Sequence, residues 1–191
     1  MAALLDEIIR RATEIAETPH GFISLVDKNR EFITLKVGTG IFEDPAGSLK
    51  IEPTQGLTGQ VIQTGQTQAI EDYGTWKPRL NYAGLDKVQS LIQVPLPIKQ
   101  EIVGTIGLAY TESPRHFDSD FVELLERFAT MASIALNNAQ LHTQVQQELQ
   151  ERQKKEQTIR AIFNATSDAI LLYDAESAEK LTCNCQAEEL L

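Results

Sequence analysis

The stretch from residue 118 to about residue 164 contains neither proline nor glycine, and this feature constrains the fold more than any other. Its apolar residues recur at the step of a heptad repeat: Phe121, Leu124, Phe128, Met131, Ala135, Val145, Leu149, Ile159 and Phe163. The pattern predicts one long helix that begins at Asp118 or Ser119. At 1.5 Å per residue this helix spans roughly 65–70 Å, more than the diameter of a small domain. Its far end must therefore leave the domain that its near end covers, as expected of a protein that transmits a signal.

Composition narrows the class of protein. The 191 residues are 42% hydrophobic, which is enough for one globular domain with an extension. Because 17 Lys and Arg stand against 27 Asp and Glu, we expect no nucleic-acid partner. Charged residues interrupt residues 1–17, so this segment predicts neither a signal peptide nor membrane insertion, and we expect a cytoplasmic protein. Cys183 and Cys185 stand without a nearby His or further Cys and favour a reduced pair over a metal site.

The residues before the long helix alternate between helical and strand patterns. An amphipathic helix up to Pro19 precedes the other elements, and Gly65 is expected to close a short helix that starts near Thr58. Pro95 and Pro97 place one side of their strand at an edge or a bulge, because proline lacks the donor that a strand neighbour needs. The predicted strands and hairpins cover residues 21–27 with 31–37, 48–51, 67–70, and 90–98 with 102–110.

The irregular segment from Glu71 to Asp86 is the best candidate for ligand contacts, because binding groups concentrate on loops that a rigid sheet supports. An alternative interpretation is that its aromatic rings only cover the sheet. The candidate ligand-binding residues, expected to line a pocket over the sheet, are Asp72, Tyr73, Trp76, Arg79, Tyr82, Ser90 and Gln93.

In this order, the elements and several of their residues resemble a GAF domain over residues 4–141. The resemblance implies an α+β fold with a central antiparallel sheet of about six strands. It also implies that the N- and C-terminal helices pack on one face and that a small-molecule pocket lies on the other. The residues that carry the resemblance are Gly56, Gly59, Gly65, Asp72, Ser90, Val94, Pro95, Leu96, Gly104, Gly107, Leu108, Phe117, Asp118, Ala129, Ala132, Ile134, Ala135, Asn138, Ala139 and Leu141.

Residues 162–174 resemble the opening of a PAS domain, which is another sensory module. We therefore predict a GAF domain at 1–141, a coiled-coil signalling helix or linker at 142–164, and the N-terminal fragment of a PAS-like domain at 165–191. This arrangement is typical of a multi-sensor signal-transduction protein of the histidine kinase or cyclic-di-GMP type. The output domain of such a protein is expected beyond Leu191.

The sequence disfavours the known chemistries of GAF domains. A bilin chromophore and the methionine sulfoxide reductases both need cysteines inside the domain, and none precedes Cys183. The signature of cyclic-GMP-binding GAF domains cannot be placed, so that ligand stays open. Phosphate-loop, nucleophile-elbow and zinc-protease motifs are absent from the sequence, and His20, His116 and His142 stand far apart. We expect no catalytic residues, no metal and no enzyme activity, and the cofactor is unknown.

The heptad-like pattern predicts a parallel homodimer through the long helix, in which polar heptad members fix the register. The favoured function is a sensory module that binds a small molecule and passes its state to a downstream domain through this helix. The alternative is a ligand-free dimerisation or spacer module. The predicted dimer residues are Phe121, Leu124, Phe128, Met131, Asn138, His142, Val145 and Leu149.

Overall fold

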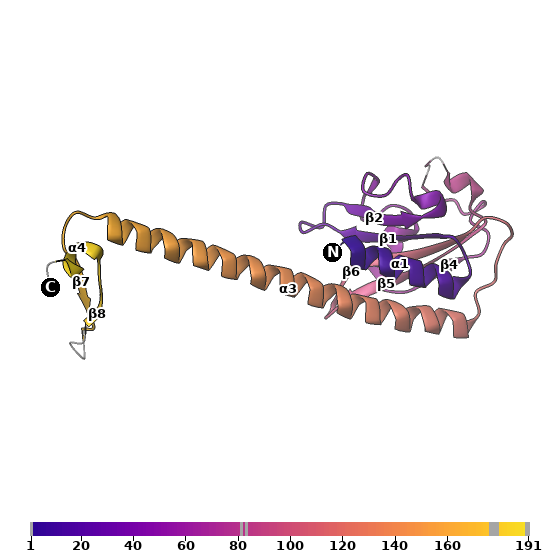
Figure 1. The fold of residues 1–191 in the computed structure, drawn as a ribbon. Helices are drawn as coiled ribbons and strands as arrows, with labels where there is room; N and C mark the ends of the chain where they lie inside the picture. Colours follow the sequence, from indigo (N-terminus) through magenta and orange to yellow (C-terminus); the bar gives the residue numbers. More distant parts are fainter. Residues whose placement is uncertain (1, 81, 83, 176–179, 190–191) are drawn as a thin grey trace. The chain divides into compact units, whose positions relative to one another are not determined.

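The computed structural model describes residues 2–80, 82, 84–175 and 180–189 (Figure 1). The chain divides into two compact units, Met1–Gln140 and Leu141–Leu191. Helix α3, Ser119–Ala165, contributes residues to both units. Its 47 residues confirm the long helix that the sequence predicts. Among the residues described, no helix is long and apolar enough to cross a membrane.

Unit 1 is built on a six-stranded antiparallel sheet in the order β3-β2-β1-β6-β5-β4, which confirms the predicted GAF-like α+β fold. Short 3-10 turns at Gly40–Phe42 and Leu85–Lys87 connect some of its elements. The helices and strands before α3 are α1 Ala2–Ala16, β1 His20–Val26, β2 Ile33–Thr39, β3 Lys50–Ile51, α2 Gly56–Thr64, β4 Gln68–Ile70, β5 Ser90–Ile98 and β6 Glu101–Tyr110.

The sheet has an apolar core on each face. Successive side chains of a strand point to opposite faces, so a strand buried on both sides contributes to two cores. On one face, α1 and the first part of α3 cover the sheet, as Figure 1 shows. The residues of this helix-side core include Ile9, Ala12, Ile23, Ile92, Val94, Leu96, Ile106, Leu108, Leu125, Ala129, Ala132 and Leu136. The opposite face holds a second core that includes Phe22, Leu35, Phe42, Leu57, Tyr73 and Leu91.

Helix ends follow local chemistry. Asp118 Oδ1 accepts a hydrogen bond from Phe121 N–H at 2.8 Å, which is the expected cap of α3. Gly65 ends α2 with φ 65°, as predicted for a left-handed C-terminal position. Helix α2 begins at Gly56 rather than near Thr58. Thr58 is 2% exposed, so its side chain faces the second core instead of capping the helix.

The prolines of β5 lie where the sequence places them. Strand β4 pairs only with residues 91–93 of β5, so Pro95 and Pro97 lie beyond that ladder, and the register with β6 shifts between Leu96 and Pro97. Their missing N–H donors therefore face an edge and an irregularity, as predicted.

The first part of α3 has two apolar sides. Leu125, Ala129, Ala132 and Leu136 are buried against the sheet. Roughly 110–130° around the helix from these residues, Leu124 is 49% and Met131 65% exposed. Of the heptad positions in this region, Leu124 and Met131 are exposed, whereas Phe121 and Phe128 are partly buried against the helix-side core.

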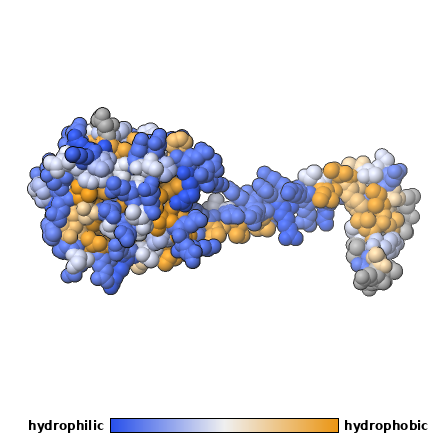
Figure 2. Space-filling view, turned by 180° about the vertical axis from the view of Figure 1, so that it is seen from behind, coloured by the Kyte–Doolittle hydropathy of each residue, from blue (hydrophilic) through white to orange (hydrophobic). Residues whose placement is uncertain are grey.

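In unit 2, α3 exposes Val145, Leu149, Ile159 and Ile162. Figure 2 shows hydrophobic residues interrupting the hydrophilic surface of this helix. Strands β7 Leu171–Tyr173 and β8 Lys180–Cys183 pair antiparallel, and α4 Cys185–Glu188 follows.

Asn184 organises unit 2. Its buried side chain donates to Phe163 O at 3.2 Å and Asp168 O at 2.8 Å, and accepts from Ile170 N and Ala187 N. These bonds tie the end of α3 to both strands and α4. The relation of this unit to PAS domains stays a prediction.

The close approach of β1 and β6 gives a stability test. A Cβ at Gly104 would lie 2.2 Å from the backbone oxygen of Ser24, which cannot move without disrupting the sheet. We expect Gly104→Ala to lower the free energy of unfolding by about 1–3 kcal/mol, measured by urea denaturation. Gly74→Ala is the control, because its nearest neighbour would be Asp72 Oδ1 at an ordinary 3.5 Å. Equal denaturation midpoints for both variants would contradict the packing described.

Candidate functional site

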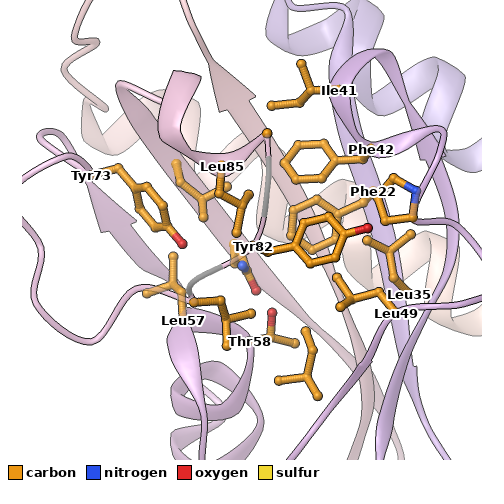
Figure 3. Close-up of a pocket in the computed structure, with 16 residues that line it drawn as sticks. Phe22, Leu35, Ile41, Phe42, Leu49, Leu57, Thr58, Tyr73, Tyr82 and Leu85 are labelled. Atoms are coloured by element: carbon orange, nitrogen blue, oxygen red, sulfur yellow. The ribbon is translucent and has the colours of Figure 1, made fainter.

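An apolar cavity of about 30 Å³ lies on the sheet face opposite α1 and α3 (Figure 3). This volume accommodates little more than water, because a water molecule needs roughly 10–15 Å³ of such space. The wall combines the sheet, the first turn of α2, the Gly40–Phe42 turn and the segment that leads into β5. The lining residues are Phe22, Leu35, Ile41, Phe42, Pro45, Leu49, Ile51, Leu57, Thr58, Tyr73, Leu80, Tyr82, Gly84, Leu85, Leu91 and Gln93.

Aromatic packing shapes the wall. The rings of Phe22 and Phe42 lie with their centroids 4.5 Å apart, and Figure 3 shows them side by side, with Tyr73 across the cavity. Phe22 can occupy this place because Gly107 of β6 has no side chain: a Cβ there would lie 2.3 Å from Phe22 Cζ. Offset and tilted rings of this kind pack favourably. The cavity is therefore bounded by well-packed side chains.

Of the residues that the structure describes, four polar side chains reach this apolar space: Thr58, Tyr73, Tyr82 and Gln93. Gln93 is 2% exposed, and none of the described residues gives its Oε1 a hydrogen bond. Burial raises the pKa of the Tyr73 hydroxyl, with the backbone of Leu80 and then Arg79 acting against that rise. Tyr73 is thus a neutral hydrogen-bonding group at physiological pH. An apolar space with a few convergent polar groups is the usual character of a small-molecule site.

Three of the seven candidate ligand-binding residues line the cavity, namely Tyr73, Tyr82 and Gln93. The other four are not among the described residues that line it, and a binding role for the seven stays a prediction. Trp76 packs on the Tyr73 ring with a centroid distance of 5.7 Å, outside the wall. Asp72 and Arg79 are exposed, and Asp72 Oδ1 instead accepts from Thr75 N–H in a local turn.

Ser90, the remaining candidate, is buried but has a structural role. Its Oγ donates to Glu71 O and accepts from Arg115 N–H, both at 2.7 Å. These bonds hold together the segments that flank β5. A buried hydroxyl with both functions satisfied has little capacity left for a ligand.

Most residues of the cavity wall are not among the candidates predicted from the sequence. Phe22, Leu35, Phe42, Leu57 and Leu85 are ordinary apolar residues of separate elements, and only the fold brings them together. The alternation of β1 and β2 predicts buried residues on this face, but it does not separate cavity-lining positions from core positions.

His20 supports one wall of the cavity. Ile41, a lining residue, donates its backbone N–H to His20 Nδ1 at 3.3 Å, and His20 Nε2 lies 3.1 Å from Thr111 Oγ1. Because Nδ1 accepts a hydrogen bond, it carries no proton. Burial lowers the pKa of His20, and the Glu112 carboxylate acts against that shift. The neutral imidazole therefore holds the Gly40–Phe42 turn in place.

Within the described ranges, no group of three or more His, Cys, Asp and Glu side chains could hold a metal ion. Cys183 and Cys185 are free, and Cys183 Sγ lies 3.8 Å from Glu188 Oε1. The cavity is thus the site whose geometry best fits ligand binding.

Comparison with known proteins identifies the family. The GAF domain family matches residues 1–137, and the chain belongs to this family. The fold, the two-faced sheet and the position of the cavity agree with this assignment.

A relative with a known role is the Nif-specific regulatory protein of Azospirillum brasilense, which is 28% identical over 153 residues. The match covers 75% of this chain but only 24% of that protein, so the chain spans about a quarter of its length. The chain is thus similar to part of a regulatory protein.

Solved structures share the fold. The GAF domain of a phosphoenolpyruvate-protein phosphotransferase from Coxiella burnetii aligns with a TM-score of 0.68 at 14% identity, over 74% of this chain and 85% of that one. A free methionine-R-sulfoxide reductase from Neisseria meningitidis, solved with its substrate, aligns with a TM-score of 0.61 at 19% identity, over 74% and 83%. The same fold therefore occurs in proteins of different activity, and function must be argued from the site.

The role of His20 predicts a pH dependence. Its pKa is lowered in the folded state, so its contribution to stability is present above the unfolded pKa of about 6.5 and is lost as pH falls through the folded pKa. We expect the urea midpoint of the native chain to fall more between pH 7.5 and pH 5.5 than that of His20→Gln, which cannot titrate. The exposed His142, changed to Gln, should behave like the native chain. An equal fall in His20→Gln and the native chain would contradict this role.

Proposed function

We propose that this chain is the sensory GAF module of a cytoplasmic signal-transduction protein, which binds a small molecule over its sheet. Occupancy then alters a dimeric α3 helix that leads to a downstream PAS-like and output domain. The similarity to a Nif-specific regulatory protein supports a regulatory role rather than a catalytic one.

The observation that carries this proposal is the alternation along β5. Leu91 and Gln93 line the cavity, whereas their neighbours Ile92 and Val94 belong to the core shared with α3. A ligand that moves Gln93 therefore also moves residues that pack against the helix. Closely packed cores transmit such displacements because they have few voids to absorb them.

Binding alone does not produce a signal. The ligand must prefer one arrangement of the helices, and it can shift the equilibrium only by that difference in affinity. The packing of Leu125, Ala129 and Leu136 of α3 against the sheet provides the contact through which the two states can differ.

The exposed side of α3 supports dimerisation. Leu124, Met131, Val145 and Leu149 present apolar side chains that are 49%, 65%, 62% and 54% exposed. They fall on heptad positions, and burying each fully contributes about 1.5–3 kcal/mol. Because Leu124 and Met131 face away from the sheet, the proposed seam already starts in unit 1.

The other predicted seam residues differ in exposure. Asn138 and His142 are exposed polar members of the repeat, while Phe121 and Phe128 are partly buried against the helix-side core. Polar residues in a seam favour one register at a cost in stability. A seam of this composition is suited to shifting between arrangements of similar energy.

The second candidate is a ligand-free dimerisation or spacer module. The small cavity volume of about 30 Å³ favours it, because the wall already fills most of the space.

Mass spectrometry of small molecules released from the purified chain separates the two functions. A stoichiometric metabolite supports the sensor, and its absence together with unaltered signalling by Tyr73 and Gln93 variants supports the spacer.

Dimerisation has its own test. Val145→Glu places a charge in the proposed seam, and we expect the dimer dissociation constant in sedimentation equilibrium to rise at least about tenfold. Gln147→Glu adds the same charge about 200° around the helix and should leave the constant unchanged. A native chain that sediments as a monomer at high micromolar concentration, or equal effects of the two variants, would refute the seam.

A further inference from the structure

We propose that a second pocket of unit 1 binds a small zwitterion of the amino-acid class, whose carboxylate pairs with Arg115 and whose ammonium group faces Glu17 and Glu112. This pocket is separate from the cavity over the sheet, so the inference goes beyond the proposed function and does not depend on it. Two observations carry it. The pocket is polar and large enough for such a molecule, and its charged side chains of opposite sign do not pair with one another.

The pocket lies where the end of α1 leads into β1 and where β6 leads towards α3. Residues 17–20 and 110–115 line it. Its volume is about 260 Å³, against about 30 Å³ for the cavity over the sheet. Because a water molecule needs roughly 10–15 Å³ of such space, a small organic molecule fits this pocket. A ligand here would contact both the segment that follows α1 and the segment that precedes α3.

The Arg115 guanidinium is held in a defined position. Its Cζ lies 4.7 Å from the centroid of the Tyr110 ring and 5.2 Å from that of the Phe121 ring. Its Nη1 donates a hydrogen bond to Ala16 O, the last residue of α1, at 3.3 Å. Aromatic faces and the C-terminal end of a helix both attract a cation. A side chain that is already fixed in this way loses little conformational entropy when it binds an anion.

Arg115 retains donors for a ligand. An arginine carries five N–H donors, and within the described part of the chain only one of those of Arg115 has a hydrogen-bond partner. None of the carboxylates that the structure describes forms an ion pair with it. The planar guanidinium matches a carboxylate, which accepts two parallel hydrogen bonds from it. Arg115 can therefore hold the carboxylate of a ligand.

Two glutamates supply the opposite charge. Glu17 and Glu112 are exposed, line the same pocket, and form no ion pair among the described residues. Burial raises the pKa of the Tyr110 hydroxyl, the charge of Arg115 acts against that rise, and the charge of Glu17 adds to it. Charges of both signs thus act on one side chain of the pocket without pairing with each other.

This charge distribution decides the class of ligand. A simple anion that binds Arg115 would also face two carboxylates, and a simple cation would face the guanidinium. Like charges at close range repel each other, so each of these ligands gives up part of what it gains. A zwitterion places each of its charges beside the opposite charge of the pocket.

Three probes of closely related shape test the proposal by NMR titration of the full chain, followed at the amide signals of Thr111 and Ser113. L-Alanine carries both charges, propionate lacks the ammonium group, and ethylamine lacks the carboxylate. We expect L-alanine to bind roughly tenfold more tightly than ethylamine, because hydrogen bonds to a half-buried guanidinium are lost. The preference over propionate should be about two- to fivefold, because exposed carboxylates contribute less.

Matched variants assign the roles of the side chains. In Arg115→Gln, the preference for L-alanine over ethylamine should fall to about one. Arg127→Gln, which changes an exposed arginine of α3 outside the pocket, should keep that preference. Replacing both Glu17 and Glu112 by Gln should reduce the preference over propionate to about one and leave the preference over ethylamine unchanged.

Each outcome supports or overturns the proposal. Equal or tighter binding of propionate or ethylamine by the native chain overturns the ligand class, and preferences that survive in the variants overturn the assigned roles. Amide shifts that avoid residues 17–20 and 110–115, or no shifts at all, show that the pocket does not bind this class. The proposed sensing over the sheet then still stands, because it concerns a different cavity. The native chain and the glutamate variant decide the proposal even if Arg115→Gln does not fold.

Discussion

Strands β5 and β6 are covered on both faces, and the alternation of their side chains joins two cores through a single backbone. Ile92 and Val94 lie under the helices, and Leu91 and Gln93 face the cavity. In the proposed mechanism, a displacement at the cavity is therefore passed through β5 to the residues that pack against the first part of α3. The small residues of β6 extend this constraint, because Gly107 is what allows the Phe22 ring to lie over the strand.

The cavity is small, and Gln93 is one of four polar side chains of the described residues that reach it. A core that served stability alone would place an apolar side chain at Gln93, since an unpaired buried oxygen opposes folding. Natural proteins retain such groups where function requires them. Among the described residues, Ser24 and Thr105 also carry buried oxygens without a hydrogen-bond partner, and of the three only Gln93 lines the cavity.

The sequence predicted the fold well because its signals were periodic and local. The heptad repeat predicted the long helix, and Gly65 and Asp118 predicted two helix ends. The segments of alternating apolar and polar residues predicted the strands. The site was harder, because a cavity wall is assembled from residues far apart in the chain. Polar residues such as Gln93 could be selected from sequence, but Asp72 and Ser90 belong to local turns and bonds that only the fold reveals.

The central claim is that the cavity and the helix dimer share one equilibrium. The most direct test measures the distance between spin labels at position 142 of the two protomers, using His142→Cys in a chain whose Cys183 and Cys185 are replaced by Ser. Saturation with the small molecule that mass spectrometry releases from the purified chain should change the distance distribution between the labels, because the bound ligand prefers one helix arrangement. An unchanged distribution, with the cavity shown by NMR to be occupied, would contradict the account.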